Sequence, residues 1–235
     1  MYLDLIYIII ILWSVNTLNK RLTSDKKIIS EKIISITLLS IIVLFFALIV
    51  YINFLQNPNF YCTDMYSDMC YSQEVWEHKS IFPEGWVFGN QFYAVATPVV
   101  ASIFFGITKN HTLAMAITST LMSLLILLSF AWMIKPMCKK QSSCFAGLVI
   151  LLALPLFLTN PITKTTGWQL LYTMCSYYAC YAITAFLGYG CYLRFHSKIS
   201  LSTKIILIVT LILSLGCGIQ SLRQTVIMIL PLPIR

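Results

Sequence analysis

Charge is scarce in this chain of 235 residues, and acidic charge is the scarcest. Charged residues make up 10% of the sequence and hydrophobic residues 59%, whereas a soluble domain carries about 25% charged residues. The mean hydropathy is +0.83. Because so little charge leaves too little polar surface to cover a water-soluble globule, the composition predicts an integral membrane protein. We expect it in a bacterial cytoplasmic membrane, with the lipid bilayer as its main partner.

The spacings typical of metal and redox sites are also missing. The sequence holds no CxxC and no HExxH motif, so spacing gives little support for a metal centre. Six of the eight cysteines lie in or beside apolar segments, where we expect small packing residues. Cys62 and Cys70 differ because they lie in a polar segment. The sequence is compatible with a disulfide between these two cysteines and with two free thiols, since spacing alone does not fix the geometry.

The net charge of +8 comes from short basic clusters between apolar runs. The clusters lie within 20–32, 135–140 and 194–204. This distribution is typical of the cytoplasmic loops of membrane proteins. We therefore expect no nucleic-acid partner, and we expect all three clusters on the cytoplasmic side.

Long apolar runs predict an all-α, polytopic bundle of transmembrane helices. A helix needs about 20 apolar residues to cross the hydrocarbon core. Run 2–18 has no basic segment before its apolar core and no small-residue cleavage site, so we interpret it as a span rather than a signal peptide. The predicted spans are 2–18, 33–55, 112–134, 145–159, 169–192 and 205–222.

Run 92–107 is the exception among the apolar runs. It has 16 residues and contains Pro98, which tends to kink a helix. If this run crossed the membrane, the second and third basic clusters would lie outside. We therefore predict a re-entrant or interfacial helix, which is tolerated where protein covers it. The alternative is a short crossing that leaves some positive charges on the outer side.

The polar loop 56–91, predicted to lie outside, holds five of the eight acidic residues and one of the sixteen Lys and Arg residues. Asp64 and Asp68 are four residues apart, so on a helix they share one face. Such a pair binds a cation or raises the pKa of one carboxyl, which then works as a general base. From Tyr71 onward the pattern indicates an amphipathic helix at the membrane interface. Trp86 fits either an aromatic belt at the interface or a platform on which a sugar stacks.

In the predicted topology, bases from separate segments face the same side as Asp64 and Asp68. Acids and bases that converge on one surface are typical of a site for a phosphorylated substrate. The alternative is that these side chains lie in headgroup water. The bases are Lys109, His111, Lys164 and Arg223.

The order of segments over roughly 33–160 resembles polytopic glycosyltransferases of the GT-C class. A long span precedes an acidic outer loop and the stretch Trp-x-x-Lys-Ser-Ile-Phe-Pro-Glu-Gly-Trp at 76–86. A short helix with a proline and the Phe-Gly pair at 105–106 then precede a long helix. The resemblance covers the N-terminal half of such enzymes. This chain departs from their pattern at one position. Many members have an Arg where this chain has Ala116.

The resemblance implies a sugar transfer from a polyprenyl-phosphate donor to an acceptor outside the cytoplasm. Asp64 or Asp68 would be the catalytic base, and a divalent cation or basic side chains would stabilise the leaving phosphate. The candidate substrate-binding residues are Glu77, Trp86, Lys109, His111 and Arg223.

Two other functions stay open. A small-molecule transporter component would carry ionisable residues inside its spans, and the cores of 33–55, 112–134 and 169–192 carry none. A non-catalytic membrane subunit would require a second membrane chain that supplies further spans. The abrupt ending at Leu230–Arg235 leads us to expect that the chain is a portion of a longer protein.

Overall fold

The structure is a computed structural model that describes residues 24–56, 62–88, 95–159, 166–173, 178–194 and 200–220. These residues form helices joined by turns, and within them the only extended pairing is an isolated bridge between Thr159 and Thr166. The prediction of an all-α fold is confirmed. The longer helices are α2 (Ser24–Tyr51), α3 (Thr63–His78), α4 (Thr97–Thr108), α5 (His111–Ile134), α6 (Gln141–Ala153), α7 (Ala179–Arg194) and α8 (Leu201–Gln220). The short ones are the π-helices η1 (Ile52–Gln56) and η5 (Gln169–Thr173), and the 3-10 turns η3 (Lys135–Met137) and η4 (Leu154–Phe157).

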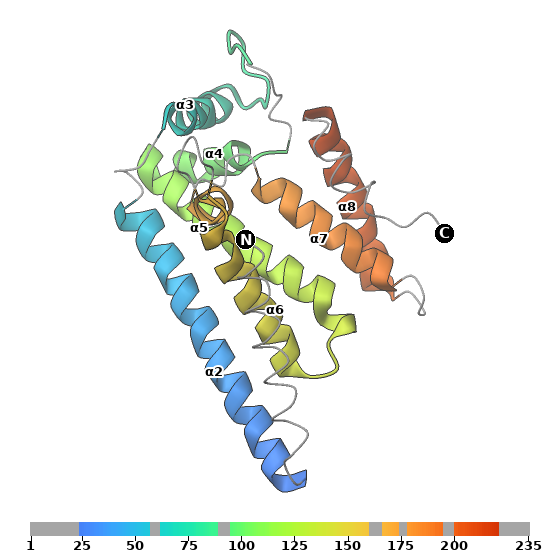
Figure 1. Cartoon of the computed structure of the whole chain (residues 1–235). Coiled ribbons are helices and arrows are strands. Elements are labelled where there is room, and N and C mark those ends of the chain that lie inside the picture. The colour runs from blue at the N-terminus through green and yellow to red at the C-terminus, as the bar shows by residue number, and fades with distance from the viewer. Residues whose placement is uncertain are drawn as a thin grey trace.

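Helices α2, α5, α6, α7 and α8 run lengthwise through the molecule, and α3 and α4 lie together at one end, as Figure 1 shows. Helix α5 is central, because it packs against α4 and α7 and also contacts α2, α3 and α6. Its buried residues include many small ones, such as Ala114, Ala116 and Ser119. Small side chains let neighbouring helices approach closely. The packing of α3 and α4 against α5 positions the candidate functional site.

A buried polar contact joins three elements in the core. The Asn53 side chain in η1 is 0% exposed, and its Nδ2 donates to Thr120 Oγ1 and to the Tyr172 carbonyl oxygen, each at 3.2 Å. Ser123 Oγ of α5 donates to the same carbonyl at 2.9 Å. Thus Asn53 and Ser123 together bind one backbone carbonyl of η5.

The predicted span 169–192 contains the π-helix η5 over Gln169–Thr173 and the α-helix α7 over Ala179–Arg194. π-helical turns occur mostly as short irregularities, often at functional sites. Here side chains from two other elements donate to the Tyr172 carbonyl within η5. The other long runs within the described ranges form helices near the predicted bounds, and α3 begins at Thr63 rather than at Tyr71.

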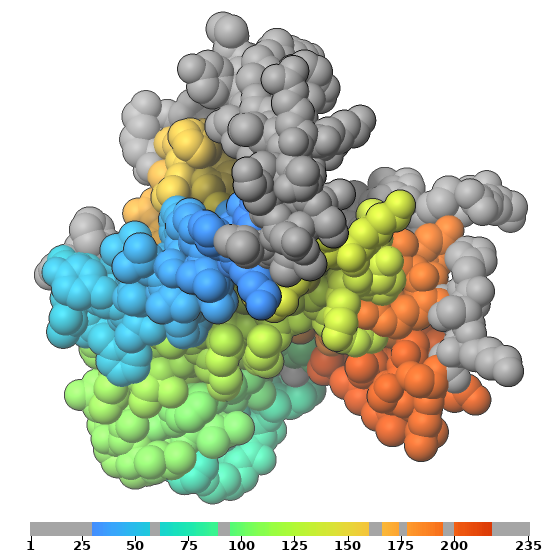
Figure 2. All heavy atoms as spheres, turned by 90° about the horizontal axis from the view of Figure 1, so that it is seen from below, coloured from blue at the N-terminus to red at the C-terminus, as the bar shows by residue number. Residues whose placement is uncertain are grey.

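The outer faces of α2 and α8 are apolar and exposed. Leu44 of α2 and Leu215 of α8 are each 69% exposed, and Figure 2 shows the two helices on opposite flanks of the molecule. Within the described ranges, two helices are long and apolar enough to cross a membrane, Ser30–Gln56 and His111–Met137. Thr97–Thr108, Gln141–Phe157 and Leu201–Cys217 are shorter apolar helices. The predicted span 2–18 lies outside the described residues.

The starts of α2 and α6 and the end of α7 lie at the end of the molecule away from α3 (Figure 1), which we name the basic end. Lys140 Nζ, ahead of α6, lies 3.1 Å from Glu31 Oε2 of α2. Arg194, at the end of α7, donates to the Trp132 carbonyl at 2.6 Å, and its guanidinium carbon lies 3.8 Å from the Trp132 ring centroid. Described members of the three basic clusters thus lie at one end, while Lys109 lies beside α3.

Helix α4 lies beside α3, in the region where the sequence predicts a re-entrant or interfacial helix over 92–107. Its 12 residues span about 18 Å, well short of the roughly 30 Å of a hydrocarbon core. Its contacts are with α3 and α5. Its placement at a membrane surface stays a prediction.

Candidate functional site

Helix α3 has one buried and one exposed face. Met65, Met69 and Val75 are buried, at the spacing that one face of a helix requires. The two methionines form a small apolar cluster with Ala101 of α4 and Met115 of α5. This packing fixes which residues of the acidic loop turn inward and which face solvent.

The two predicted catalytic carboxylates have different surroundings. Asp64 is exposed in the first turn of α3, where a negative charge also favours the helix N-terminus. Asp68 is 0% exposed. Asp64 and Asp68 are four residues apart, which is slightly more than one helical turn. The boundary of the buried face of α3 therefore falls between them. Of the pair, only Asp64 is open to a substrate in this structure.

Tyr71 links Asp68 to the turn that follows α3. Its side chain is 0% exposed, and its hydroxyl donates to the Ile81 carbonyl oxygen at 2.6 Å. Burial raises the pKa of Tyr71 to about 12, and the negative charge of Asp68 adds to this effect. The phenol therefore stays protonated at neutral pH and keeps its donor role.

The turn after α3 folds back so that its aromatic rings cover Tyr71. Trp86 N–H donates to the Pro83 carbonyl at 3.2 Å, and Gly85 has a φ of 80°, which suits glycine at this turn position. The ring centroids of Trp86 and Phe88 lie 5.3 Å and 5.7 Å from that of Tyr71. Trp86, a predicted substrate-binding residue, is thus half-buried against Tyr71.

Two lysines converge on one indole ring, and we name Trp76, Lys79 and Lys109 the Trp76 cluster. Lys79 and Lys109 stand at the C-terminal ends of α3 and α4, each with a φ of 53°. Their Nζ atoms lie 3.2 Å and 5.2 Å from the Trp76 ring centroid. A Cβ on Gly106 would lie 2.4 Å from the ring, so the missing side chain is what lets α4 approach Trp76.

The carboxylates described near the Trp76 cluster have partners other than its lysines. Glu74 Oε2 lies 3.2 Å from His78 Nε2. Among the described side chains, no carboxylate forms an ion pair with Lys79 or Lys109. The cation–π attraction of each ammonium is worth about 0.5–1 kcal/mol at an exposed site. Two ammonium groups held near one ring favour an anion that accepts hydrogen bonds from both.

His111 lies beside this cluster through a shared aromatic ring. Its imidazole stacks on Phe105 with a centroid separation of 4.5 Å, and Lys109 Nζ lies 5.8 Å from the same phenyl ring. His111 Nδ1 is buried and has no hydrogen-bond partner among the described residues. Lys109 and His111, which are two residues apart in the chain, thus contact the same Phe105 ring.

The remaining predicted residues lie apart from the cluster or beyond the described ranges. Glu77 is exposed on α3, and its Oε1 accepts a hydrogen bond from Gln73 Nε2 at 2.7 Å. Arg223 and Lys164 lie outside the described residues.

The disulfide considered for Cys62 and Cys70 is absent, and both thiols are free. Cys62 is the N-cap residue of α3 and Cys70 lies within the same helix. Eight residues of helix separate them by about 12 Å, while a disulfide needs Cα atoms within about 7 Å. Their helical spacing therefore keeps them reduced.

Sequence reasoning did not select Trp76, Lys79 or Tyr71 as site residues. A Trp and a Lys three apart at the end of a helix lie on one face, which is a signal that points to this pair. Nothing in the spacing links them to Lys109, because that contact depends on the packing of α4 on α3.

No three His, Cys, Asp or Glu side chains form a metal-binding group within the described ranges. Those residues do not fit the divalent cation that the resemblance implies, and the chemistry proposed below uses none. No protein-family model, curated protein or solved structure matches this chain. The function therefore has to be argued from the site itself.

Proposed function

We propose that this chain is a polytopic membrane protein, or part of one, that transfers a sugar from a polyprenyl-phosphate donor to an acceptor outside the cytoplasm. The observation that carries this proposal is the Trp76 cluster, in which Lys79 and Lys109 converge on one ring beside the acidic helix α3. Two cations and an aromatic surface suit an anionic group beside an apolar one, as lipid-linked substrates of this reaction carry.

The exposed apolar faces of α2 and α8 support the membrane part of the proposal. A soluble protein rarely exposes a long continuous apolar face, whereas lipid is the natural partner of one. The charged residues of the described chain gather at the basic end and around α3. We propose six spans in all, including 2–18, with the α3–α4 end outside and the basic end in the cytoplasm.

Asp64 is the proposed catalytic base, because it is exposed and Asp68 is not. Its carboxylate takes the proton from an acceptor hydroxyl, and the hydroxyl oxygen attacks the anomeric carbon of the sugar. The bond between that carbon and the phosphate oxygen breaks, and its electron pair stays on the phosphate. Lys79 ends α3 about 22 Å along the helix axis from Asp64, so the Trp76 cluster holds an anionic group of the bound substrates away from the bond that breaks.

The test is the transfer of labelled sugar in membranes from a panel of polyprenyl-phosphate donors. Asp64→Asn should lower transfer at least 100-fold, within the range typical for loss of a general base. Glu84→Gln, in the exposed turn after α3, is the matched control and should keep the wild-type rate. Equal rates for the two variants, or no transfer with any donor, would contradict the proposal.

A small-molecule carrier is the second candidate, favoured by the π-helix η5. Buried Asn53 and Ser123 bind a backbone carbonyl of this π-helix, and irregular helical segments form the binding sites of many transporters. Uptake of labelled solute into vesicles by both wild type and Asp64→Asn, without sugar transfer, would favour the carrier.

A further inference from the structure

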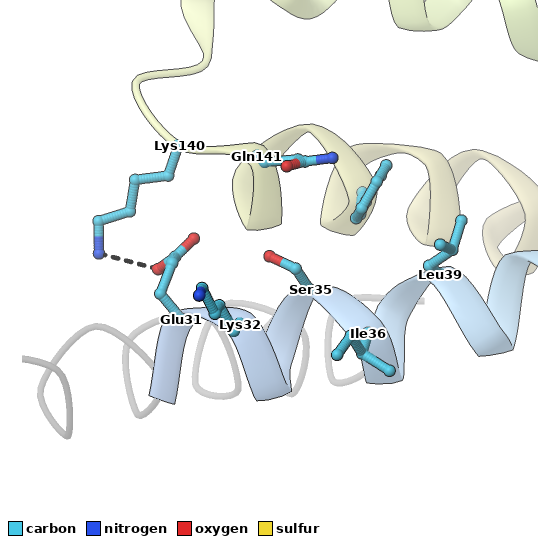
Figure 3. A pocket seen from close by; sticks show the side chains of 8 residues that line it. Glu31, Lys32, Ser35, Ile36, Leu39, Lys140 and Gln141 are labelled. Atoms are coloured by element: carbon cyan, nitrogen blue, oxygen red, sulfur yellow. Dashed lines mark hydrogen bonds and ion pairs between the residues drawn. The ribbon is translucent and has the colours of Figure 1, made fainter. Parts of the chain in front are cut away.

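A pocket of about 390 Å³ opens between α2 and α6 at the basic end, far along the chain from the Trp76 cluster. Figure 3 shows Ser35 and Leu39 rising from α2 towards α6, with Glu31 reaching Lys140 at the mouth. Glu31, Ser35 and Leu39 are four residues apart and so share one face of α2. The two helices pack against each other along this face.

The lining changes from polar to apolar along the bundle axis. Near the start of α2 it consists of Glu31, Lys32 and Ser35, and then come Ile36 and Leu39. From Glu31 to Leu39 the helix rises about 12 Å, which takes the lining from the interface into the depth of a hydrocarbon core.

Helix α6 repeats the same order, from Lys140 and Gln141 to Phe145. Both helices begin at the basic end (Figure 1), so the two polar portions face each other at the mouth of the pocket. The apolar portions likewise meet deeper in the bundle. One molecule with a polar head and an apolar chain would match the whole lining.

The mouth carries a surplus of positive charge. Glu31 is occupied, because Lys140 Nζ lies 3.1 Å from its Oε2 and the Ser142 N–H donates to its Oε1 at 3.4 Å. Lys32 makes no ion pair within the described residues. An ammonium has three donors, so Lys140 can bind a second anion while it keeps Glu31.

We infer that this pocket binds an anionic phospholipid of the leaflet at the basic end. The phosphate lies between Lys32 and Lys140, and one acyl chain runs along Ile36, Leu39 and Phe145. Basic pockets between transmembrane helices on the cytoplasmic side are known to bind acidic headgroups. The inference rests on the proposed membrane embedding and does not depend on sugar transfer.

The test uses the full chain in nanodiscs or detergent, with bound lipid counted by native mass spectrometry. Phosphatidylglycerol should bind more tightly than phosphatidylcholine with the same acyl chains. Lys32 is exposed, so Lys32→Ala should leave the fold intact and weaken phosphatidylglycerol binding about fivefold, the effect of one basic group near a membrane surface. Lys135→Ala is the matched control, since Lys135 is exposed at the same end and does not line the pocket.

Two further arms identify the ligand. Leu39→Gln should weaken phosphatidylglycerol binding, because it places a polar group against the acyl chain. Glycerol 3-phosphate, which lacks acyl chains, should not compete at concentrations where the lipid saturates. Equal competition by glycerol 3-phosphate would assign the pocket to a free phosphate and overturn the inference. Equal binding of both lipids, or equal effects of Lys32→Ala and Lys135→Ala, would also overturn it, whatever the outcome of the sugar-transfer assay.

Discussion

At the scale of single residues, burial decides between side chains of the same type. Asp64 and Asp68 are chemically identical and four positions apart, but the first is exposed and the second is 0% exposed. Burial raises the pKa of the Tyr71 phenol, and the charge of Asp68 adds to the rise. We therefore assign Asp64 to chemistry and Asp68 to the surroundings of Tyr71.

The raised pKa of Tyr71 predicts a loss of stability in alkaline solution. The folded protein has a Tyr71 pKa of about 12, above the ordinary tyrosine pKa of 10.0, so folding favours the protonated phenol. This contribution is fully present below pH 10 and is lost as the pH rises from 10 to 12. The rise in pKa corresponds to about 2–3 kcal/mol of stability.

The free energy of unfolding in denaturant, measured from pH 9 to pH 12, tests this prediction. The Tyr71→Phe variant has no ionisable group at position 71, so its free energy of unfolding should fall less steeply between pH 9 and pH 12. Parallel curves for the wild type and Tyr71→Phe would show that Tyr71 ionises equally in the folded and unfolded chains.

At the scale of elements, the sequence predicts which segments form helices better than it predicts irregular turns within them. The long apolar runs form helices, because apolar composition and length favour helix whatever the neighbours are. The π-helix at Gln169–Thr173 binds donors from Asn53 and Ser123, which lie at least 49 positions from Tyr172 in the sequence. Likewise, Lys109 joins Lys79 at Trp76 only because α4 packs on α3.

The C-terminal end of α3 allows the charge of Lys79 to be removed without disturbing the backbone. Lys79 has a φ of 53°, a conformation that glycine adopts at no steric cost. Lys79→Gly should keep α3 intact, with a stability equal to or about 1 kcal/mol above that of the wild type, while sugar transfer falls about tenfold.

Lys79→Arg is the control for this prediction, because it retains the positive charge over Trp76 and should retain most of the transfer. Thermal unfolding and sugar transfer are measured on the same preparations. A Lys79→Gly variant with full transfer would remove Lys79 from the site.

The polar contact in the core predicts a stability effect at a single position. Asn53→Ala removes both donors from Nδ2 and leaves a cavity where the side chain is now buried, so it should lower the free energy of unfolding by about 1–3 kcal/mol. Gln56→Ala, three positions along in the same π-helix, is the control, since among the described residues the Gln56 side chain bonds the exposed Tyr51 hydroxyl. Thermal unfolding in detergent should show a lower midpoint for Asn53→Ala alone.

At the scale of the whole molecule, charge separates the two ends. Lys140 and Arg194 lie at the basic end through contacts with Glu31 and Trp132, and Lys109 lies at the other end beside α3. The sequence predicts this separation because basic residues mark cytoplasmic loops. It does not predict that Asp68 turns inward, since that depends on the docking of α3.

The proposed function requires the α3–α4 end and the basic end to lie on opposite sides of a membrane. The most direct measurement is labelling of single-cysteine variants in intact cells with a membrane-impermeant maleimide. One variant keeps only Cys70, which is exposed on α3, and the other carries Lys139→Cys, which is exposed ahead of α6. We predict labelling of Cys70 in intact cells and labelling of the position-139 cysteine only after permeabilisation. Labelling of both positions from the same side would contradict the account.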